Sequence, residues 1–384
     1  MISSRNRRSV AVVAAVPMSL QAFMRPHLLA ATEYFDTSAI CSDISGIGHT
    51  LPAVTCHKVD IRRNISLIAD LAALWSLMRL FRRQRFDLVH SVTPKAGLLA
   101  MMAAWLSGVP VRIHIFTGQV WATRRGPSRW LLKTLDLLIA SLATHALVDS
   151  PSQRDFLIAE GILTAKRSEV LGGGSICGVD PLRFTPAPSM RLSMRAALGI
   201  PSSAVVFLYL GRLNPDKGIR DLAIAFASVA AERKDVWLLV VGPDEGDEAA
   251  RVRALCAGAV ERLLRIDFTP EPERYMQCAD VFCLPSYREG FGTSVIEAAA
   301  CGLPAIASRI YGLTDAVEDG HTGLLHPPHN VDAIAACIRR FAESPALRHE
   351  MGQAARSRAV RFFSQSTITN ELMRVYRQKL EIKT

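Results

Sequence analysis

The second half of the chain contains the stretch Val281-Phe-Cys-Leu-Pro-Ser-Tyr-Arg-Glu-Gly-Phe-Gly-Thr-Ser-Val-Ile-Glu-Ala-Ala-Ala-Cys-Gly-Leu-Pro304. Its apolar run 281–284 predicts a buried strand, and a glycine-rich loop follows that run directly. Thr293 or Ser294 is expected to cap a helix, which Gly302 and the proline beyond it should end. A buried strand, a short loop and a helix in this order form the repeating unit of parallel α/β domains.

Short apolar runs of this kind alternate with helical patterns along the whole chain. In the first half the expected strands are residues 10–16, 37–40, 54–58, 88–91, 112–116, 146–149 and 169–171. In the second half they are residues 205–210, 236–241, 263–268, 281–284 and 305–308. The predicted fold class is therefore α/β, with two Rossmann-like, doubly wound domains.

The boundary between the two domains is expected where both periodicities are interrupted, over residues 172–189. Glycines and prolines crowd this stretch, which is typical of a linker. We expect an N-terminal domain over residues 1–185 and a C-terminal domain over 186–363. Residues 364–384 read as one amphipathic helix that crosses back toward the N-terminal domain.

Composition and charge narrow the class of protein. The 384 residues are 49% hydrophobic and 21% charged, as in a globular protein. The net charge of +10 is uneven: residues 1–184 hold 21 Lys and Arg against 12 Asp and Glu, and the remainder holds 24 against 23. Eight cysteines without C-x-x-C spacing favour free thiols in the cytoplasm over disulfides or a zinc site. No charge-free stretch reaches the ~18 residues of a membrane span.

Three common phosphate-binding patterns are missing from the sequence. No G-x-G-x-x-G motif follows a strand, since Gly172–Gly178 has the wrong spacing and leads into no helix. No Walker lysine motif occurs. No two aspartates stand at D-x-D spacing, so the usual clamp that holds a metal and a diphosphate is absent.

The loop and helix of the opening stretch suit an anionic ligand that carries hydroxyl groups. Glycines before a helix N-terminus let backbone N–H groups approach a diphosphate, which the helix dipole also favours. Glu297, expected in the first turn, can accept hydrogen bonds from a ribose diol, and Glu289 on the loop can reach another part of the same ligand. Read singly, Glu297 is a dipole-stabilised glutamate and Glu289 a solvated one; the glycines favour the functional interpretation.

A second candidate segment, Leu210-Gly-Arg-Leu-Asn-Pro-Asp-Lys-Gly-Ile219, joins a strand to a helix. Arg212 and Lys217 therefore lie on a loop at the carboxyl edge of the sheet, where open α/β folds bind ligands. A guanidinium and an ammonium at this edge suit a diphosphate leaving group. Loop cations are often merely solvated, but the framing glycines favour a binding role.

Together these segments resemble glycosyltransferase family 4. The pattern E-G-F-G-x-x-x-x-E-A-x-A-x-G-x-P from Glu289, the block 211–218, and Gly312 with Asp319-Gly-x-x-Gly-Leu-Leu match the family's motifs. The resemblance covers essentially the whole chain. It implies the GT-B fold, in which the N-terminal domain binds the acceptor, the C-terminal domain binds a nucleotide sugar and both face a central cleft. It also implies retention of anomeric configuration without a metal or other cofactor.

The resemblance implies a role for each matched residue. Arg212 and Lys217, in the phosphate-binding element that begins at Gly211, would neutralise the departing diphosphate. Glu297 would bind the ribose hydroxyls, and Glu289 would hold sugar hydroxyls and stabilise an oxocarbenium-like centre. The backbone around the sugar and phosphates would come from Gly290, Phe291, Gly292, Thr293 and Ser294. An acceptor hydroxyl would attack on the leaving-group face and pass its proton to a phosphate oxygen.

The acceptor side is expected in the N-terminal half. His90, at a strand end, either contacts substrate or is a hydrogen-bonded core histidine. Thr117 stands where many family members carry a histidine, so Thr117, Gly118 and Gln119 are expected to line the site. The segments 117–123 and 149–155 resemble bacterial enzymes of capsule, O-antigen and exopolysaccharide synthesis. That likeness implies a hexosyl donor, expected to be UDP-linked, and a saccharide acceptor, expected to be linked to polyprenyl diphosphate.

Basic and apolar side chains alternate between residues 62 and 85. The cations are Arg62, Arg63, Arg79, Arg82, Arg83 and Arg85. They suit docking on the cytoplasmic face of an anionic membrane, although a core-packed helix with a basic outer face has the same pattern. Two other functions stay open: a nucleotide-sugar epimerase or hydrolase of the same fold, and a non-catalytic protein with a basic surface. No aromatic stacking motif indicates nucleic acid as a partner.

Overall fold

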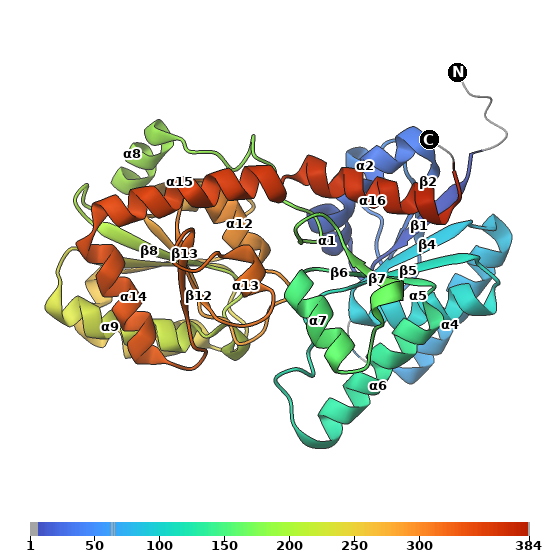
Figure 1. Ribbon diagram of the computed structural model, residues 1–384, viewed down its shortest axis with the longest axis horizontal. Helices are drawn as coiled ribbons and strands as arrows, with labels where there is room; N and C mark the ends of the chain where they lie inside the picture. The colour runs from blue at the N-terminus through green and yellow to red at the C-terminus, as the bar shows by residue number, and fades with distance from the viewer. Residues whose placement is uncertain (1–6, 63, 65, 383–384) are drawn as a thin grey trace. The chain divides into compact units, whose positions relative to one another are not determined.

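The computed structural model describes residues 7–382 except positions 63 and 65. The described chain forms two compact units (Figure 1). The first contains the described residues up to Cys177 and those from Gln365 onward, and the second contains Gly178–Ser364. Each unit is an open parallel sheet covered by helices on both faces, as the sequence predicts.

The first unit is built on a seven-stranded sheet in the order β3-β2-β1-β4-β5-β6-β7. Its strands are β1 (Ser9–Val13), β2 (Asp36–Cys41), β3 (Thr55–Lys58), β4 (Leu88–Val92), β5 (Val111–Phe116), β6 (His145–Val148) and β7 (Ser168–Val170). Neighbouring strands pair in parallel throughout. The strand order reverses between β1 and β4, which makes that point the switch of the sheet.

Both faces of the first sheet are apolar because its strands alternate between two buried clusters. Val10 and Val12 face one cluster, whereas Ala11 and Val13 face the other. The helical elements are α1 (Pro17–Ser19), η1 (Leu20–Met24), α2 (Arg25–Tyr34), α3 (Ile47–Thr50), α4 (Leu67–Gln84), α5 (Pro94–Leu106), α6 (Gly126–Leu142), α7 (Pro151–Ala159), η2 (Ala165–Arg167) and α16 (Gln365–Lys379). Helices α2 and α16 pack together over the first cluster, and α4, α5 and α6 cover the second.

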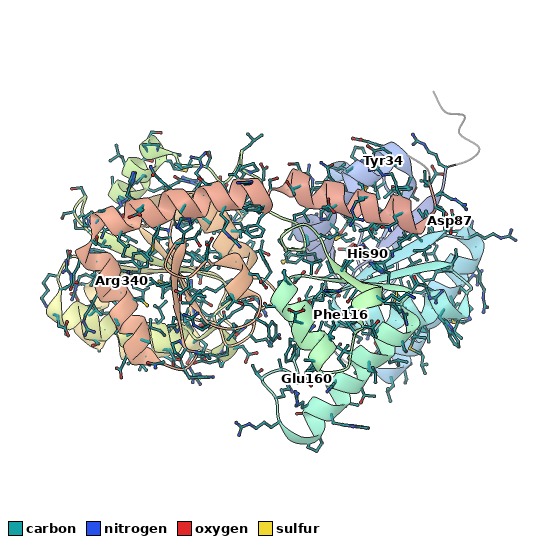
Figure 2. The ribbon with its side chains drawn as sticks, in the orientation of Figure 1. Tyr34, Asp87, His90, Phe116, Glu160 and Arg340 are labelled. Atoms are coloured by element: carbon teal, nitrogen blue, oxygen red, sulfur yellow. The ribbon has the colours of Figure 1, made fainter. Side chains whose placement is uncertain are left out.

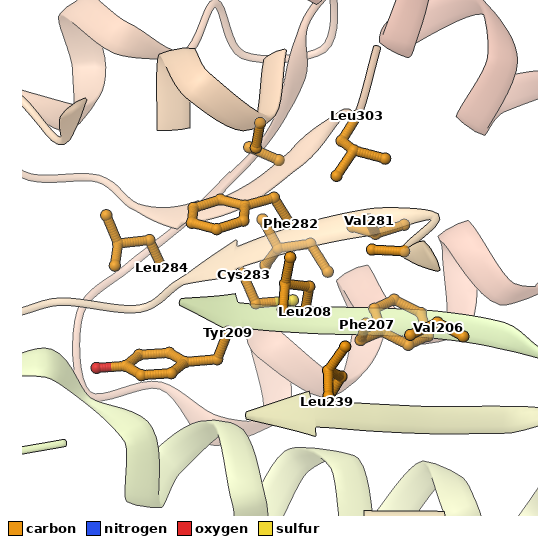
Figure 3. Close-up of a cluster of buried hydrophobic side chains, with 14 of the residues drawn as sticks. Val206, Phe207, Leu208, Tyr209, Leu239, Val281, Phe282, Cys283, Leu284 and Leu303 are labelled. Atoms are coloured by element: carbon orange, nitrogen blue, oxygen red, sulfur yellow. The ribbon is translucent and has the colours of Figure 1, made fainter. Parts of the chain in front are cut away.

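The second unit has a six-stranded sheet in the order β10-β9-β8-β11-β12-β13. Its strands are β8 (Val205–Leu210), β9 (Val236–Val241), β10 (Leu263–Ile266), β11 (Val281–Leu284), β12 (Ala305–Ser308) and β13 (Gly323–His326). The switch point lies between β8 and β11. Figure 3 shows the buried side chains of β8, β9 and β11 that fill the centre of this unit.

Helices cover both faces of the second sheet as well. They are α8 (Pro188–Ala197), η3 (Pro215–Lys217), α9 (Ile219–Glu232), α10 (Glu248–Leu255), η4 (Ala257–Arg262), α11 (Pro272–Cys278), α12 (Thr293–Ala300), α13 (Leu313–Ala316), α14 (Val331–Glu343) and α15 (Pro345–Phe362). Helix α9 packs against α10 and α14. Helices α8, α11, α12 and α15 form the other set, in which α11 packs on α8 and α12 packs on α15.

Two parts of the predicted organisation differ from the structure. Strand β13 is missing from the prediction, because only four residues form it and a glycine turn precedes it. The boundary expected after residue 185 lies eight residues earlier, after Cys177. The reason is that Val179 donates to the Phe363 carbonyl at 2.8 Å and Phe184 belongs to the core of the second unit.

The predictions about cysteines, the basic residues between 62 and 85, and membrane spans can be compared with the described residues. All eight cysteines are free thiols, and six of them are buried. The cations Arg79, Arg82 and Arg83 are exposed on α4, whereas Arg63 lies outside the described residues. Among the helices that the structure describes, each is too short or too polar to pass through a bilayer.

Candidate active site

The predicted donor residues lie at the carboxyl edge of the second sheet, on both sides of its switch point. Lys217 belongs to the loop after β8, and Glu289 belongs to the loop after β11. Gly218 allows the two loops to touch, since a Cβ there would stand 2.0 Å from the carbonyl oxygen of Pro285 and its φ is +65°. Because ligands of open α/β sheets bind at such a point, the two loops form the centre of the candidate site.

The Glu289 carboxylate joins the two loops. Its Oε1 atom lies 2.5 Å from Lys217 Nζ and accepts a hydrogen bond from Ser286 Oγ at 2.8 Å. Both charged side chains are largely buried, so water screens the pair little. The structure thus brings together one predicted cation and one predicted carboxylate.

Arg212 lies at the same edge but contacts a different carboxylate. Its half-exposed guanidinium pairs with Glu245 at 2.8 Å, in the loop after β9. Gly211 fits closely here, because a Cβ on the neighbouring Gly242 would stand 2.0 Å from the Gly211 carbonyl oxygen. The site therefore draws cations from one loop and carboxylates from two others.

Helix α12 begins at the loop that carries Glu289, but neither Thr293 nor Ser294 caps it. The N-cap is Gly292, whose φ of +90° suits a glycine. Because glycine has no side chain, no side-chain hydrogen bond caps the helix. Phe291 is buried and packs edge-on against Phe363 at 5.1 Å, so only its backbone can serve a ligand. The first N–H groups of α12, from Thr293 and Ser294, have no partner within the helix and can meet an anion.

The backbone of Gly290 is held by another predicted residue, Gly312. A Cβ at Gly312 would stand 2.5 Å from the carbonyl oxygen of Gly290. In the same motif, Asp319 accepts from the Leu325 amide at 2.8 Å and pairs with Arg309 at 2.5 Å. This block therefore positions the glycine loop and β13.

Glu297 lies in the second turn of α12, not in the first turn, since the helix begins at Thr293. Burial raises the pKa of its carboxyl to about 7, with a lowering influence from Arg183 and a raising one from Glu273. Among the described residues its carboxylate has no hydrogen bond or ion pair, and Lys217 and Arg212 pair with Glu289 and Glu245 instead. A carboxylate in such surroundings can accept hydrogen bonds from a ligand.

Two residues of the site are absent from the sequence-based prediction. Tyr209 ends in a hydroxyl that donates to the Arg212 carbonyl at 2.7 Å and points past the carboxyl end of β8 (Figure 3). Burial and the Glu289 charge raise the pKa of Tyr209. Arg265 on β10 donates to the Gly242 carbonyl at 2.5 Å, and its Nε and Nη1 atoms are buried without a partner in the described chain. Both lie within apolar strand runs, which hides them from motif searches.

His90 does not lie at a strand end. It is the third residue of β4 and is buried in the first unit (Figure 2). Its Nδ1 contacts the Tyr376 hydroxyl of α16 at 2.6 Å. Burial lowers its pKa to about 3, so the ring is neutral at ordinary pH. These contacts match the alternative of a core histidine, and they turn the side chain away from solvent.

Thr117, Gly118 and Gln119 follow β5 at the carboxyl edge of the first sheet. Gln153 ties them together, donating to the Thr117 carbonyl at 2.7 Å and to Gln119 Oε1 at 2.9 Å. All three residues line a pocket of about 550 Å³ that reaches between α4, α5 and α6. The predicted acceptor residues other than His90 therefore share one pocket.

Comparison with known families matches both units. Residues 190–358 match the model described as glycosyl transferases group 1, and residues 27–174 match that of a glycosyl transferase 4-like domain. A D-inositol 3-phosphate glycosyltransferase of Acidothermus cellulolyticus is 35% identical over 77% of this chain and 68% of its own. The chain belongs to the group 1 glycosyltransferases. The GT-B fold that its sequence implied is confirmed by the two Rossmann-like units.

Other proteins are similar to this glycosyltransferase along most of the chain. The capsular polysaccharide biosynthesis glycosyltransferase CapM of Staphylococcus aureus is 29% identical over 83% of this chain and 84% of its own. The UDP-Gal:α-D-GlcNAc-diphosphoundecaprenol α-1,3-galactosyltransferase of Escherichia coli is 27% identical over 95% of each chain. Anabaena HepE, solved with UDP and glucose, has the same fold, with a TM-score of 0.81, 18% identity and coverage of 96% of this chain and 99% of its own.

Proposed function

We propose that this glycosyltransferase moves a hexosyl group, with retention, from a UDP-linked sugar to a saccharide carried on polyprenyl diphosphate. The donor half rests on one observation: Lys217 and Glu289 meet at the switch point of the second sheet at 2.5 Å. The acceptor half is supported by the Escherichia coli relative, whose substrate is a saccharide on diphosphoundecaprenol. The Staphylococcus aureus relative, named for capsular polysaccharide biosynthesis, supports a role in surface polysaccharide synthesis. The proposal puts the reaction at the cytoplasmic face of the membrane.

The cations act on the leaving group in this proposal. Lys217 and Arg212 stand on the loop after β8 and neutralise the charge that develops on the diphosphate. The N-terminus of α12 adds its first N–H groups from Thr293 and Ser294. Because side chains and backbone supply this charge, the proposed reaction uses no metal ion and no other cofactor.

The two glutamates act on the sugars. Glu289 accepts hydrogen bonds from the transferred hexose and stabilises positive charge as the bond to the diphosphate lengthens. Glu297 accepts from the ribose hydroxyls, which favours its charged form over the protonated form that burial favours. The acceptor hydroxyl attacks on the face from which the diphosphate leaves, and its proton passes to a phosphate oxygen. No covalent sugar–enzyme bond is needed.

The proposal is tested with a screen of labelled UDP-sugars against lipid-linked saccharide acceptors. The wild-type chain should transfer one sugar with retained configuration, and Glu289→Gln and Lys217→Met should lower kcat by about 10²–10³, the loss typical of one electrostatic contact. Glu271→Gln, at an exposed glutamate paired with Arg274, is the matched control and should keep full activity.

The products of the same screen distinguish the proposed transferase from a hydrolase, an epimerase and a non-catalytic protein. Free sugar without transfer would indicate a hydrolase, and a changed nucleotide sugar would indicate an epimerase. Binding of nucleic acid without any binding of UDP would support a non-catalytic protein with a basic surface. Undiminished transfer by Glu289→Gln would refute the assigned site.

A further inference from the structure

The pocket that contains Thr117–Gln119 in the first unit is mostly hydrocarbon. Its volume of about 550 Å³ falls in the range of ligand sites, roughly 300–1,000 Å³. Its walls come from the facing sides of three helices. The apolar wall residues include Leu74 of α4, Leu98 and Met102 of α5, and Leu132, Leu135 and Ile139 of α6. Such walls offer a sugar or nucleotide few hydrogen bonds, and they suit a hydrocarbon chain.

The mouth of the pocket is an exposed apolar rim. Leu67 and Leu71 of α4 are 79% and 66% exposed, and Leu131 of α6 is 55% exposed; all three also line the pocket. Next to them, Ile68 and Trp130 are 86% and 70% exposed. Clustered exposed side chains of this size mark a binding surface for a partner or a lipid.

A minority of the residues that line the pocket are polar. Lys95, in the first turn of α5, pairs with Asp70 at 2.7 Å, and both line the pocket. Asp136 accepts from Trp121 Nε1 at 2.7 Å. With the loop Thr117–Gln119, these groups lie where the carboxyl edge of the sheet meets the apolar walls.

Basic side chains also lie close to the apolar rim in the sequence. Arg124 and Arg125 are exposed in the segment before α6. Arg129 lies 5.0 Å from the centre of the Trp121 ring and Lys133 lies 5.8 Å from it, and both cations pair with Glu160 at 2.8 and 2.6 Å. A hydrocarbon chain that carries an anionic head group would match this combination of apolar walls and nearby cations.

We propose that this pocket holds the isoprenoid chain of the lipid-linked acceptor, with the diphosphate toward Lys95 and the chain leaving between Leu71 and Leu131. The inference deepens the proposed function and rests on it. In this proposal the apolar walls formed by α4, α5 and α6 make the enzyme prefer a lipid-linked saccharide to a free one. A bilayer lipid or a peptide helix is the competing occupant.

The test uses the full chain and a dansyl-labelled geranylgeranyl diphosphate, whose fluorescence rises in apolar surroundings. Wild type should bind the probe, and the Leu71→Gln/Leu131→Gln pair should raise its Kd at least tenfold. Both leucines are exposed, so the fold should tolerate these two substitutions. Leu135→Trp, which fills the pocket, should abolish binding. Leu192→Gln, at a 70% exposed leucine of α8, is the control and should bind like wild type.

Two further arms identify what the site recognises. Inorganic pyrophosphate should displace the probe only at concentrations far above those of unlabelled geranylgeranyl diphosphate. Vesicles of phosphatidylglycerol without polyprenol should compete weakly. Displacement by pyrophosphate alone, or pocket-dependent binding of plain vesicles in place of the probe, would overturn the proposal.

UDP binding separates this inference from the proposed function. All variants should bind UDP like wild type. If wild type transfers sugar to a lipid-linked acceptor but does not bind the probe, the pocket proposal alone fails. If the probe binds as expected and no donor sugar is ever transferred, the proposed function fails and the pocket assignment stands.

Discussion

At the scale of single residues, the site combines groups that sequence motifs reveal with groups that they do not. Glu289 and Lys217 could be predicted to lie close together because each follows a strand beside the switch point. Tyr209 and Arg265 could not, because both stand within strands whose other residues are apolar. His90 was ambiguous for a related reason: a histidine on a buried strand has the same sequence context whether it contacts substrate or Tyr376.

The raised pKa of Glu297 predicts that stability depends on pH. The folded state holds this proton up to about pH 7, whereas an unfolded glutamate, with its ordinary pKa of 4.5, releases it near that pH. Folding stability should therefore fall as pH rises from about 4.5 to 7 and stay level above. Glu297→Gln should match wild type at about pH 4 and exceed it at about pH 8 by about 2 kcal/mol, less than the full shift implies because the side chain is partly accessible. Urea unfolding at both values, with Glu271→Gln as control, measures this.

The same residue predicts a pH dependence of nucleotide binding. If ribose hydroxyls donate to the Glu297 carboxylate, UDP binds its charged form, and affinity should weaken below pH 7 by up to about tenfold per pH unit. Calorimetric titration with UDP between pH 5.5 and 8 should show this slope, and Glu297→Gln should remove it. A slope that survives in the variant would assign the titration to another group.

At the scale of elements, buried parallel strands could be recognised as short apolar runs with loops at their ends. The start of α12 could not be predicted as accurately as the strands. Thr293 and Ser294 are of the residue types that usually cap helices, but the N-cap is Gly292, which has a positive φ. Strand β13 is short and depends on a close approach, since a Cβ at Gly323 would stand 2.4 Å from the Ala305 carbonyl oxygen. Such contacts belong to tertiary structure and leave little trace in periodicity.

Gly218 provides a test of how the loops of the second unit are joined. Gly218→Ala would force an alanine into the left-handed region of the backbone and push its Cβ against the carbonyl oxygen of Pro285. The two loops should therefore move apart, so that Lys217 separates from Glu289 and turnover falls more than tenfold. Gly199→Ala has nearly the same φ, +66°, with nothing within 4 Å of the added Cβ. It should lose about 1–2 kcal/mol of stability and keep its activity. Equal activities for the two variants would contradict the role of the close approach.

Helix α16 is attached to the first unit by a buried polar contact. Tyr376→Phe removes the partner of His90 Nδ1, and the Nε2 atom of that ring has no partner among the described residues. The change should lower the free energy of unfolding by about 1–3 kcal/mol. Tyr34→Phe, at an exposed tyrosine on the neighbouring α2, should change it little. Thermal and urea denaturation of both variants provide the measurement.

At the scale of the whole molecule, the second unit has its own core and a continuous chain, whereas the first takes residues from two distant segments. The buried residues Ile368, Leu372 and Tyr376 complete the core of the first unit. A chain cut after residue 364 should therefore leave the first unit unfolded or aggregated, while residues 178–364 alone should fold cooperatively. Circular dichroism and proteolysis of the two fragments test this. The reverse result would mean that α16 is dispensable.

The split composition of the first unit also sets an order of events during synthesis. A ribosome that has just made Cys177 has still to add 202 residues before the end of α16 at Lys379. At about 5–20 residues per second this takes roughly 10–40 s. During that time the face of the first sheet that α16 will cover stays accessible, and the second unit can fold first. The nascent chain is thus exposed to chaperones at its earliest-made half, against the usual order in which N-terminal domains finish first.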